Sequence, residues 1–169
     1  VVTVNGSQAV LERLGLPAVP VMRLMNRSEL KSSIVSGVAA REVLRGLSTE
    51  NLVVISHKVS SRHRLLVMLR LWWLGYRYRS LTVLDMRDRR HVMQKMLGDR
   101  YDASKPPSNG IFLALLALHL GATRILMSGF SLSKTGHVYN KLGLPRRHLD
   151  ADTLALRRIV ASGLPVYTN

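Results

Sequence analysis

Residues 105–139 read KPPSNGIFLALLALHLGATRILMSGFSLSKTGHVY, and this stretch decides the fold class that the sequence predicts. Pro106-Pro107 stiffen the backbone and disfavour a helix before them. Ser108 and Asn109 then offer side-chain oxygens that can cap the first amides of a helix. Residues 111–120 are apolar on nearly every helical face, so we expect this helix to be buried.

A short strand and a polar loop follow the apolar helix. Gly121 stands where a left-handed residue would end the helix, and residues 124–130 (RILMSGF) predict a strand. Gly129 would let the backbone approach a ligand at the end of this strand. The polar loop carries Ser131, Ser133, Lys134, Thr135, His137 and Tyr139. A helix start that can receive an anion, followed by a strand that opens into a polar loop, is typical of ligand sites in open α/β sheets.

Strands and helices alternate along the rest of the chain at intervals of roughly 25 residues, which is typical of βα units. The expected strands lie at residues 1–4, 19–24, 52–56, 81–86, 124–130 and 166–168. The expected helices lie at residues 8–14, 29–33, 38–44, 62–75, 88–97, 111–120 and 150–159. The sequence therefore predicts an α/β fold with a Rossmann-like parallel sheet flanked by helices, in a single domain over residues 1–169.

The composition indicates what kind of partner the protein has. The 169 residues carry a formal net charge of +15, which favours an acidic partner: nucleic acid, an anionic glycan, a nucleotide or an anionic membrane surface. The sequence has no cysteine, which excludes disulfide bonds and thiolate metal sites. It shows no signal-peptide pattern, and the apolar helix at residues 111–120 is too short to span a bilayer.

Basic side chains are dense between residues 62 and 100, and aromatic side chains lie among them. The basic residues are Arg62, Arg64, Arg70, Arg77, Arg79, Arg87, Arg89, Arg90, Lys95 and Arg100. The aromatic residues are Trp72, Trp73, Tyr76 and Tyr78. Such interleaving can bind nucleic acid or seat a protein on an anionic membrane. The alternative is a solvated basic face with the tryptophans buried. In either case Ser60 or Ser61 can cap a helix over residues 62–75. The apolar stripe of that helix would consist of Leu65, Leu66, Leu69, Trp72 and Trp73.

Polar residues follow or end several predicted strands, where ligands sit in parallel sheets. They are Asn5, His57, Asp85 and Ser131. Asn5-Gly6 taken alone can also be interpreted as a tight turn. The sequence contains no G-x-S-x-G, Walker A or complete G-x-G-x-x-G motif, which removes the motif support for serine hydrolase, P-loop and dinucleotide sites.

A histidine and two aspartates stand at the start of the last predicted helix. A helix dipole favours the neutral form of His148, which is suited to accepting a proton; the alternative is an exposed loop histidine. Asp150-Ala151-Asp152 matches the D-x-D of metal-dependent sugar transferases. Basic residues precede it and a helix follows, so helix capping is the better account. His119 lies inside the apolar helix and is interpreted as a core residue.

Three features together resemble one known family. They are residues 107–130, the G-x-x-Y of residues 136–139, and His148 with the helix that follows it. This combination is similar to bacterial CMP-sialic-acid-dependent sialyltransferases, in which a helix start, a strand-end glycine, a tyrosine-bearing lid and a histidine base form the site. Residues 1–7 (VVTVNGS) resemble the second strand of that family. Related Kdo transferases also use a CMP-activated keto-acid donor.

The resemblance implies a role for each matching residue. The donor nucleotide would be held by Asn5, Gly6, Ser108, Asn109, Gly110, Gly129, Ser131 and Ser133. Tyr139 would hydrogen-bond the departing phosphate, with Ser133 and Lys134 as supplementary donors, and His148 would be the general base.

The chain also departs from the family pattern. Ser133 stands where the family has a first lid tyrosine, and the lid, at residues 131–148, is short. The glycine-rich loop expected before the first strand is absent. We therefore expect a sialyltransferase-like variant of the GT-A/GT-B type that lacks its N-terminal glycine-rich strand and loop.

The resulting functional prediction is an inverting glycosyltransferase. It would move a 2-keto acid sugar, sialic acid or Kdo, from a CMP donor to a hydroxyl of a glycan acceptor. No cofactor is expected to be required, and a divalent ion would at most stimulate the reaction. We expect a cytoplasmic protein in peripheral contact with an anionic inner membrane, with nucleic acid the less favoured partner. The alternative is a non-catalytic α/β domain that binds nucleic acid or an anionic surface.

Overall fold

The computed structural model describes residues 1–31, 35–99, 101–102, 105–129 and 148–168. The chain divides into two compact units, one formed by residues 1–86 and the other by the described residues from Arg87 onward. Each unit contains a parallel sheet, so the predicted α/β class is confirmed. The strands belong to two sheets, where the sequence predicted one. Among the described helices, none combines the length and the apolar character that a membrane span requires.

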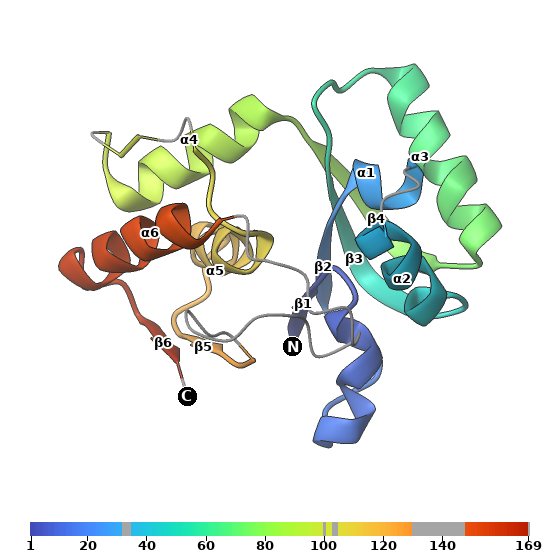
Figure 1. Cartoon of the computed structure of the whole chain (residues 1–169), viewed down its shortest axis with the longest axis horizontal. Coiled ribbons are helices and arrows are strands. Elements are labelled where there is room, and N and C mark those ends of the chain that lie inside the picture. Colours follow the sequence, from blue (N-terminus) through green and yellow to red (C-terminus); the bar gives the residue numbers. More distant parts are fainter. Residues whose placement is uncertain (32–34, 100, 103–104, 130–147, 169) are drawn as a thin grey trace. The chain divides into compact units, whose positions relative to one another are not determined.

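The first unit is built on a four-stranded parallel sheet. Its strands are β1 (Val2–Val4), β2 (Met22–Asn26), β3 (Ser48–Ile55) and β4 (Arg77–Leu84). They lie in the order β1-β2-β3-β4, so each strand pairs with its predecessor in the chain (Figure 1). Because all four strands are parallel, their carboxyl ends meet at one edge of the sheet.

Helical segments connect these strands. They are two 3-10 helices, Ser7–Val10 and Glu12–Leu14, and the helices α1 (Arg27–Lys31), α2 (Val35–Leu44) and α3 (Ser61–Leu74). Right-handed crossovers that step in one direction place their helices on one face of a sheet. Figure 1 shows α1, α2 and α3 together on one face. Leu52 and Val54 of β3 pack there against Val67 and Leu71 of α3 in the main apolar core.

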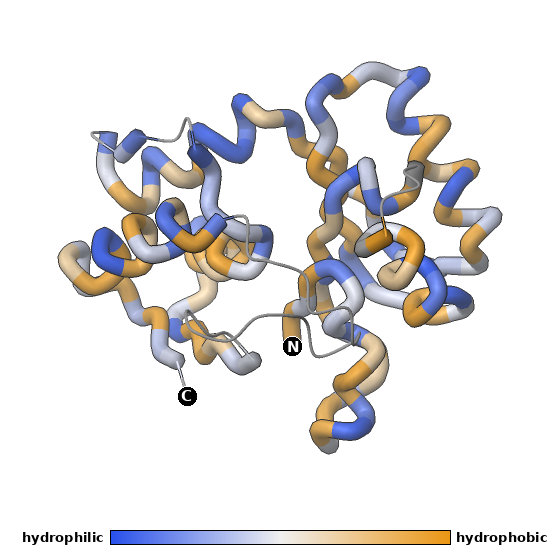
Figure 2. Tube along the Cα trace, in the orientation of Figure 1, coloured by the Kyte–Doolittle hydropathy of each residue, from blue (hydrophilic) through white to orange (hydrophobic). Residues whose placement is uncertain are grey.

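Helix α3 confirms the predicted ends but not the predicted core face. The Ser60 hydroxyl accepts a hydrogen bond from the His63 N–H at 3.3 Å, and Gly75 ends the helix in the left-handed conformation. The prediction that both tryptophans are buried is wrong, because Trp72 and Trp73 are exposed. Val67, Leu71 and Leu74 bury the other side of the helix. Figure 2 shows apolar and polar segments alternating along α3, so apolar residues lie on more than one face of the helix.

The second unit contains three longer helices and two short strands. They are α4 (Met86–Leu97), α5 (Asn109–His119), β5 (Ile125–Met127), α6 (Leu149–Ala161) and β6 (Val166–Thr168), and β5 pairs with β6 in parallel. Residues 111–117 of α5 are all buried, as their sequence predicts. His119 is only half-buried at the end of this helix. The prediction of one domain over residues 1–169 stays a prediction.

Several predicted boundaries are displaced. β2 begins and ends two or more residues after the predicted strand, and α2 begins at Val35, three residues before the predicted start of that helix. β4 begins at Arg77 and ends at Leu84, so it starts and finishes earlier than predicted. These shifts matter for the site, because they change which residues stand at the carboxyl ends of the strands.

Candidate functional site

The predicted site residues fall into three groups. Asn5 and Gly6 lie in the first unit, and residues 108–110, Gly129 and His148 lie in the second. Ser131, Ser133, Lys134 and Tyr139, with most of the predicted lid at residues 131–148, lie outside the described residues.

The start of α5 is bound to α6 through a carboxylate. Ser108 occupies the N-cap position, but its hydroxyl makes no capping hydrogen bond, contrary to the capping prediction. Its backbone N–H instead donates to Oδ1 of Asp152 at 2.6 Å. Asp152 lies in the first turn of α6 and is 1% exposed. A negative charge is favourable at the positive end of a helix, so this carboxylate stabilises the start of α5.

Arg89 ties α4 to the same place. Its guanidinium donates to the Pro107 carbonyl and lies 3.5 Å from Oδ1 of Asn109, and its Cζ sits 4.9 Å from the centroid of the Phe112 ring. Burial lowers the pKa of Arg89 to about 10, while the charge of Asp152 opposes this shift. Pro107 and Ser108, just before α5, are thus held by Arg89 of α4 and Asp152 of α6.

Tyr101 is a third buried polar residue that interacts with Arg89 and Asp152. It is 3% exposed, and among the described residues its hydroxyl has no hydrogen-bond partner. Burial raises the pKa of Tyr101, with the charges of Asp152 and Asp102 adding to the effect and Arg89 opposing it. Sequence reasoning missed Arg89 and Tyr101 as site residues, because neither stands in a motif.

The ring of His148 contacts the backbone of Pro106, the residue before the buried Pro107. Its Nδ1 lies 3.2 Å from the Pro106 carbonyl oxygen. A carbonyl oxygen can only accept a hydrogen bond, so Nδ1 must carry the proton. The lone pair of a neutral ring is then on Nε2. The imidazole is exposed, and the His148 carbonyl accepts from the Asp152 N–H at 2.8 Å, so one turn of α6 orients both side chains.

The other predicted nucleotide-binding positions differ in character. Asn109 is 7% exposed and its side-chain oxygen faces Arg89, so most of its side chain is internal. A Cβ added at Gly110 would meet only the Ser108 hydroxyl, at 3.9 Å. Gly129 has a φ of 71°, which side chains rarely adopt, and the described residues leave the space around it open. The chain therefore requires glycine at 129 for its backbone conformation.

In the first unit, Asn5 forms the predicted tight turn after β1. Its φ is 49°, in the left-handed region that asparagine tolerates. Its N–H donates to the Leu24 carbonyl at 3.0 Å, and its own carbonyl accepts from Nε of Arg23 at 3.1 Å. Arg23 is fully buried, with its guanidinium 4.6 Å from the centroid of the Tyr76 ring. A buried cation thus fixes the turn that carries Asn5.

Further polar residues stand at the same sheet edge. Asn26, Ile55 and Leu84 pair across β2, β3 and β4, so Arg27, Ser56 and Asp85 follow at one level. Arg27 Nη1 lies 3.4 Å from the Ser56 hydroxyl, which itself donates to the Lys58 carbonyl at 2.8 Å. The sequence prediction missed Arg27 because it ended this strand two residues too early.

Glu29 lies beneath this edge. Its Oε1 accepts from the Asn26 N–H at 2.9 Å, while its Oε2 is shut off from solvent with no hydrogen-bond partner in the described structure. Burial raises the pKa of Glu29 to about 6, and the Asn26 N–H and the charge of Arg23 oppose this shift.

The D-x-D aspartates do not act as a pair. Asp152 is buried and accepts a hydrogen bond from Ser108, whereas Asp150, two residues earlier in α6, is exposed. Helix α6 begins at Leu149 with His148 at its N-cap position, so the prediction that an aspartate caps α6 is wrong. Within the described part of the chain, no group of three His, Asp or Glu side chains could hold a metal ion.

No protein-family model, curated protein or solved structure matches this chain. The sialyltransferase resemblance therefore rests on the residues themselves.

Proposed function

We propose that the protein is a glycosyltransferase that uses a CMP-activated 2-keto acid sugar, with His148 as the general base. The observation that carries the proposal is the hydrogen bond from Nδ1 of His148 to the Pro106 carbonyl at 3.2 Å. It leaves the exposed Nε2 as the proton acceptor of a neutral imidazole. An exposed histidine whose Nδ1 donates to a backbone carbonyl is suited to act as a general base through Nε2.

In the proposed reaction, Nε2 of His148 takes the proton from an acceptor hydroxyl. The acceptor oxygen forms a bond to the anomeric carbon of the sugar, and the bond between that carbon and the phosphate oxygen breaks. CMP leaves with the bonding electrons. The transition state resembles an oxocarbenium ion, so the remaining task is to stabilise the phosphate, for which the resemblance implies Tyr139.

The buried group around Asp152 supports this assignment. Asp152 binds the Ser108 N–H at 2.6 Å and also the carbonyl of His148 through its own N–H at 2.8 Å. It therefore links the base to residues 108–110, for which the resemblance implies contact with the cytidine. Arg89 and Asp152 act as positioning residues in this proposal, because they are buried and touch no substrate.

The proposal is tested by calorimetry with CMP and AMP in high salt, followed by turnover of CMP-sialic acid and CMP-Kdo. We expect CMP to bind in preference to AMP, since a transferase reads the base. His148→Ala should reduce turnover by roughly two to four orders of magnitude with little change in CMP affinity. His91→Ala, an exposed histidine on α4, is the matched control and should retain activity.

The alternative predicted from the sequence, a non-catalytic binder of anionic surfaces, gives different results in the same experiments. Polyanions would bind with an affinity that falls steeply as salt rises, and CMP would not be preferred over AMP. Equal turnover in His148→Ala and in the wild-type chain would remove His148 from the mechanism.

A further inference from the structure

Helix α3 has a second apolar face, directed away from the core of the first unit. Its core face consists of Val67, Leu71 and Leu74, which are buried. Its exposed apolar residues are Leu65 (56%), Met68 (43%), Leu69 (47%), Trp72 (75%) and Trp73 (79%). We call these five residues the α3 outer stripe.

The α3 outer stripe is continuous along the helix. Its members follow the spacing i, i+3, i+4, i+7 and i+8, which places them in one row on a helix surface. The core residues follow the same period on the opposite side. Single exposed apolar residues are normal on a protein surface, but a row of five that includes two tryptophans indicates an interaction surface.

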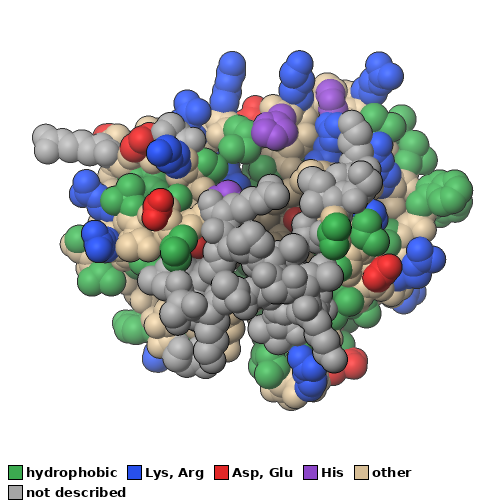
Figure 3. Space-filling model, in the orientation of Figure 1, with side chains coloured by type: hydrophobic (Ala, Val, Ile, Leu, Met, Phe, Trp, Pro, Cys, Tyr) green, Lys and Arg blue, Asp and Glu red, His purple; other side chains and the backbone are tan. Residues whose placement is uncertain are grey.

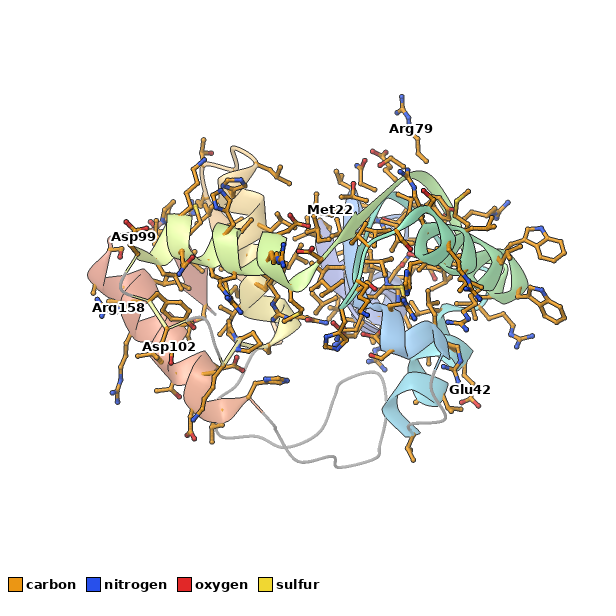
Figure 4. All side chains as sticks on the ribbon, turned by 90° about the horizontal axis from the view of Figure 1, so that it is seen from above. Met22, Glu42, Arg79, Asp99, Asp102 and Arg158 are labelled. Atoms are coloured by element: carbon orange, nitrogen blue, oxygen red, sulfur yellow. The ribbon has the colours of Figure 1, made fainter. Side chains whose placement is uncertain are left out.

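The sequence segment that carries the stripe is basic and has no acidic residue. Between residues 51 and 84 the sequence contains no Asp or Glu. The basic residues of this segment are Lys58, Arg62, Arg64, Arg70, Arg77 and Arg79. Arg62 and Arg64 are exposed in the first turn of α3, where Nη2 of Arg64 lies 3.4 Å from the Leu81 carbonyl of β4, and Arg77 and Arg79 are exposed just after the end of the helix. Figure 4 shows Arg79 projecting away from the ribbon, and Figure 3 shows several Lys and Arg side chains standing out from the visible surface.

We propose that the α3 outer stripe docks the protein on an anionic lipid bilayer. Helix α3 lies in the plane of the membrane surface, with Leu65, Met68 and Leu69 at the boundary of the acyl chains. Trp72 and Trp73 lie at the level of the headgroups, where tryptophan rings are favoured. The flanking arginines contact the lipid phosphates. This pairing of an apolar row with cations is the chemistry that interfacial helices use.

Two other occupants fit the stripe less well. A single-stranded nucleic acid would need ring faces on which successive bases stack, but the two indoles meet edge to face, with an interplanar angle of 82° and centroids 6.4 Å apart. A second copy of the chain packed stripe to stripe would bring the arginines of one α3 segment against those of the other, and residues 51–84 contain no Asp or Glu. Lipid headgroups supply the missing negative charge.

The test uses the full chain and vesicles of phosphatidylcholine with or without phosphatidylglycerol. Trp72 and Trp73 are the two tryptophans of the sequence, so the intrinsic emission reports on the stripe alone. We expect a shift of the emission to shorter wavelength, and quenching by brominated lipids, with the anionic vesicles only. Sedimentation of the protein with the vesicles gives the partition coefficient.

Three variants separate the contributions. Trp72→Ser/Trp73→Ser should lower the partition coefficient at least about tenfold, because it removes the two largest side chains that enter the interface. Arg77→Gln/Arg79→Gln should lower it by about fivefold per charge removed. Val160→Ser, on α6, is the matched control, since Val160 is 77% exposed but lies outside the stripe, and it should bind as the wild type does. Circular dichroism must show that each variant is folded.

Specific outcomes overturn the proposal. Anionic vesicles that bind the tryptophan variant as tightly as the wild type would place the membrane contact elsewhere. An emission shift with oligothymidylate but not with vesicles would assign the stripe to nucleic acid. Dimerisation that the tryptophan substitutions abolish would assign it to a second copy. None of these readouts depends on the proposed transferase activity.

Discussion

The backbone N–H of Ser108 and the carboxylate of Asp152 meet at 2.6 Å, although 44 residues separate them in the sequence. Through this bond, the first turn of α6 supplies the negative charge at the start of α5. His148 lies one helical turn before Asp152, and its ring contacts the Pro106 carbonyl in the segment that Asp152 also binds.

Replacing Asp152 with alanine should destabilise the protein. The change leaves the Ser108 N–H without its acceptor and removes the charge that partly compensates buried Arg89. Loss of a hydrogen bond to a charged group costs about 1.5–3 kcal/mol, which urea unfolding measures. Asp150→Ala is the control: Asp150 is exposed in the same turn, and its loss should cost less than about 1 kcal/mol. Equal losses in the two variants would show that the buried contact contributes nothing specific.

Replacing His148 with asparagine should separate the roles of its two ring nitrogens. The asparagine amide can still donate to the Pro106 carbonyl, but it offers no basic nitrogen at the position of Nε2. We expect an unchanged unfolding free energy and a turnover lower by roughly two to four orders of magnitude. NMR of the ¹⁵N-labelled wild type should find the proton of the neutral ring on Nδ1. A proton on Nε2 instead would contradict the tautomer derived from the structure.

Glu29 should make stability depend on pH in a defined window. Its pKa is raised from 4.5 to about 6 by burial, so the folded state binds a proton more tightly than the unfolded state does. Its contribution to stability is therefore complete below pH 4.5 and is lost as pH rises through 6. The change is at most about 2 kcal/mol.

The matched variant is Glu29→Gln, which keeps an oxygen for the Asn26 N–H but cannot ionise. Denaturant unfolding at several pH values between 4 and 8 should give a difference between the two proteins that moves in favour of the variant as pH rises. A difference that stays constant across this window would show that Glu29 has an ordinary pKa.

Two glycines of the candidate site should respond differently to alanine. Gly129→Ala forces a side chain into a left-handed conformation, at a cost of roughly 1–2 kcal/mol. Gly110 lies in the first turn of α5 with room for a methyl group, so Gly110→Ala should leave stability unchanged or raise it by up to about 1 kcal/mol. If residues 108–110 hold the cytidine, CMP affinity should fall in Gly110→Ala despite this stability. Thermal unfolding and calorimetry with CMP measure both effects.

The ends of α3 and the buried helix α5 were predicted correctly from residues that are neighbours in the sequence. Ser60 and Gly75 mark both ends of α3, and the unbroken apolar run at 111–117 identified a helix buried on all sides. The parallel arrangement followed from the alternation of strands and helices. These features depend on neighbouring residues, which the sequence shows directly.

Other features depend on residues far apart in the chain. The Ser108–Asp152 bond and the position of Arg89 between Asn109 and Phe112 have no local signature. The core face of α3 was predicted wrongly, because both of its faces are apolar and only packing selects Val67 over Trp72. His148, Ser108 and Asn5 could be chosen as candidates from local sequence features, whereas the buried residues that support them could not.

The order of strands in the first unit has a consequence for biosynthesis. Val2 pairs with Met22, Met22 with Asn51, and Ser48 with Arg77, so every strand joins a partner made only a short time earlier. Sheets dominated by such short sequence separations lose little entropy in closing their loops. The sheet can therefore grow at one edge as the chain leaves the ribosome, with each new crossover helix covering the strand pair just formed.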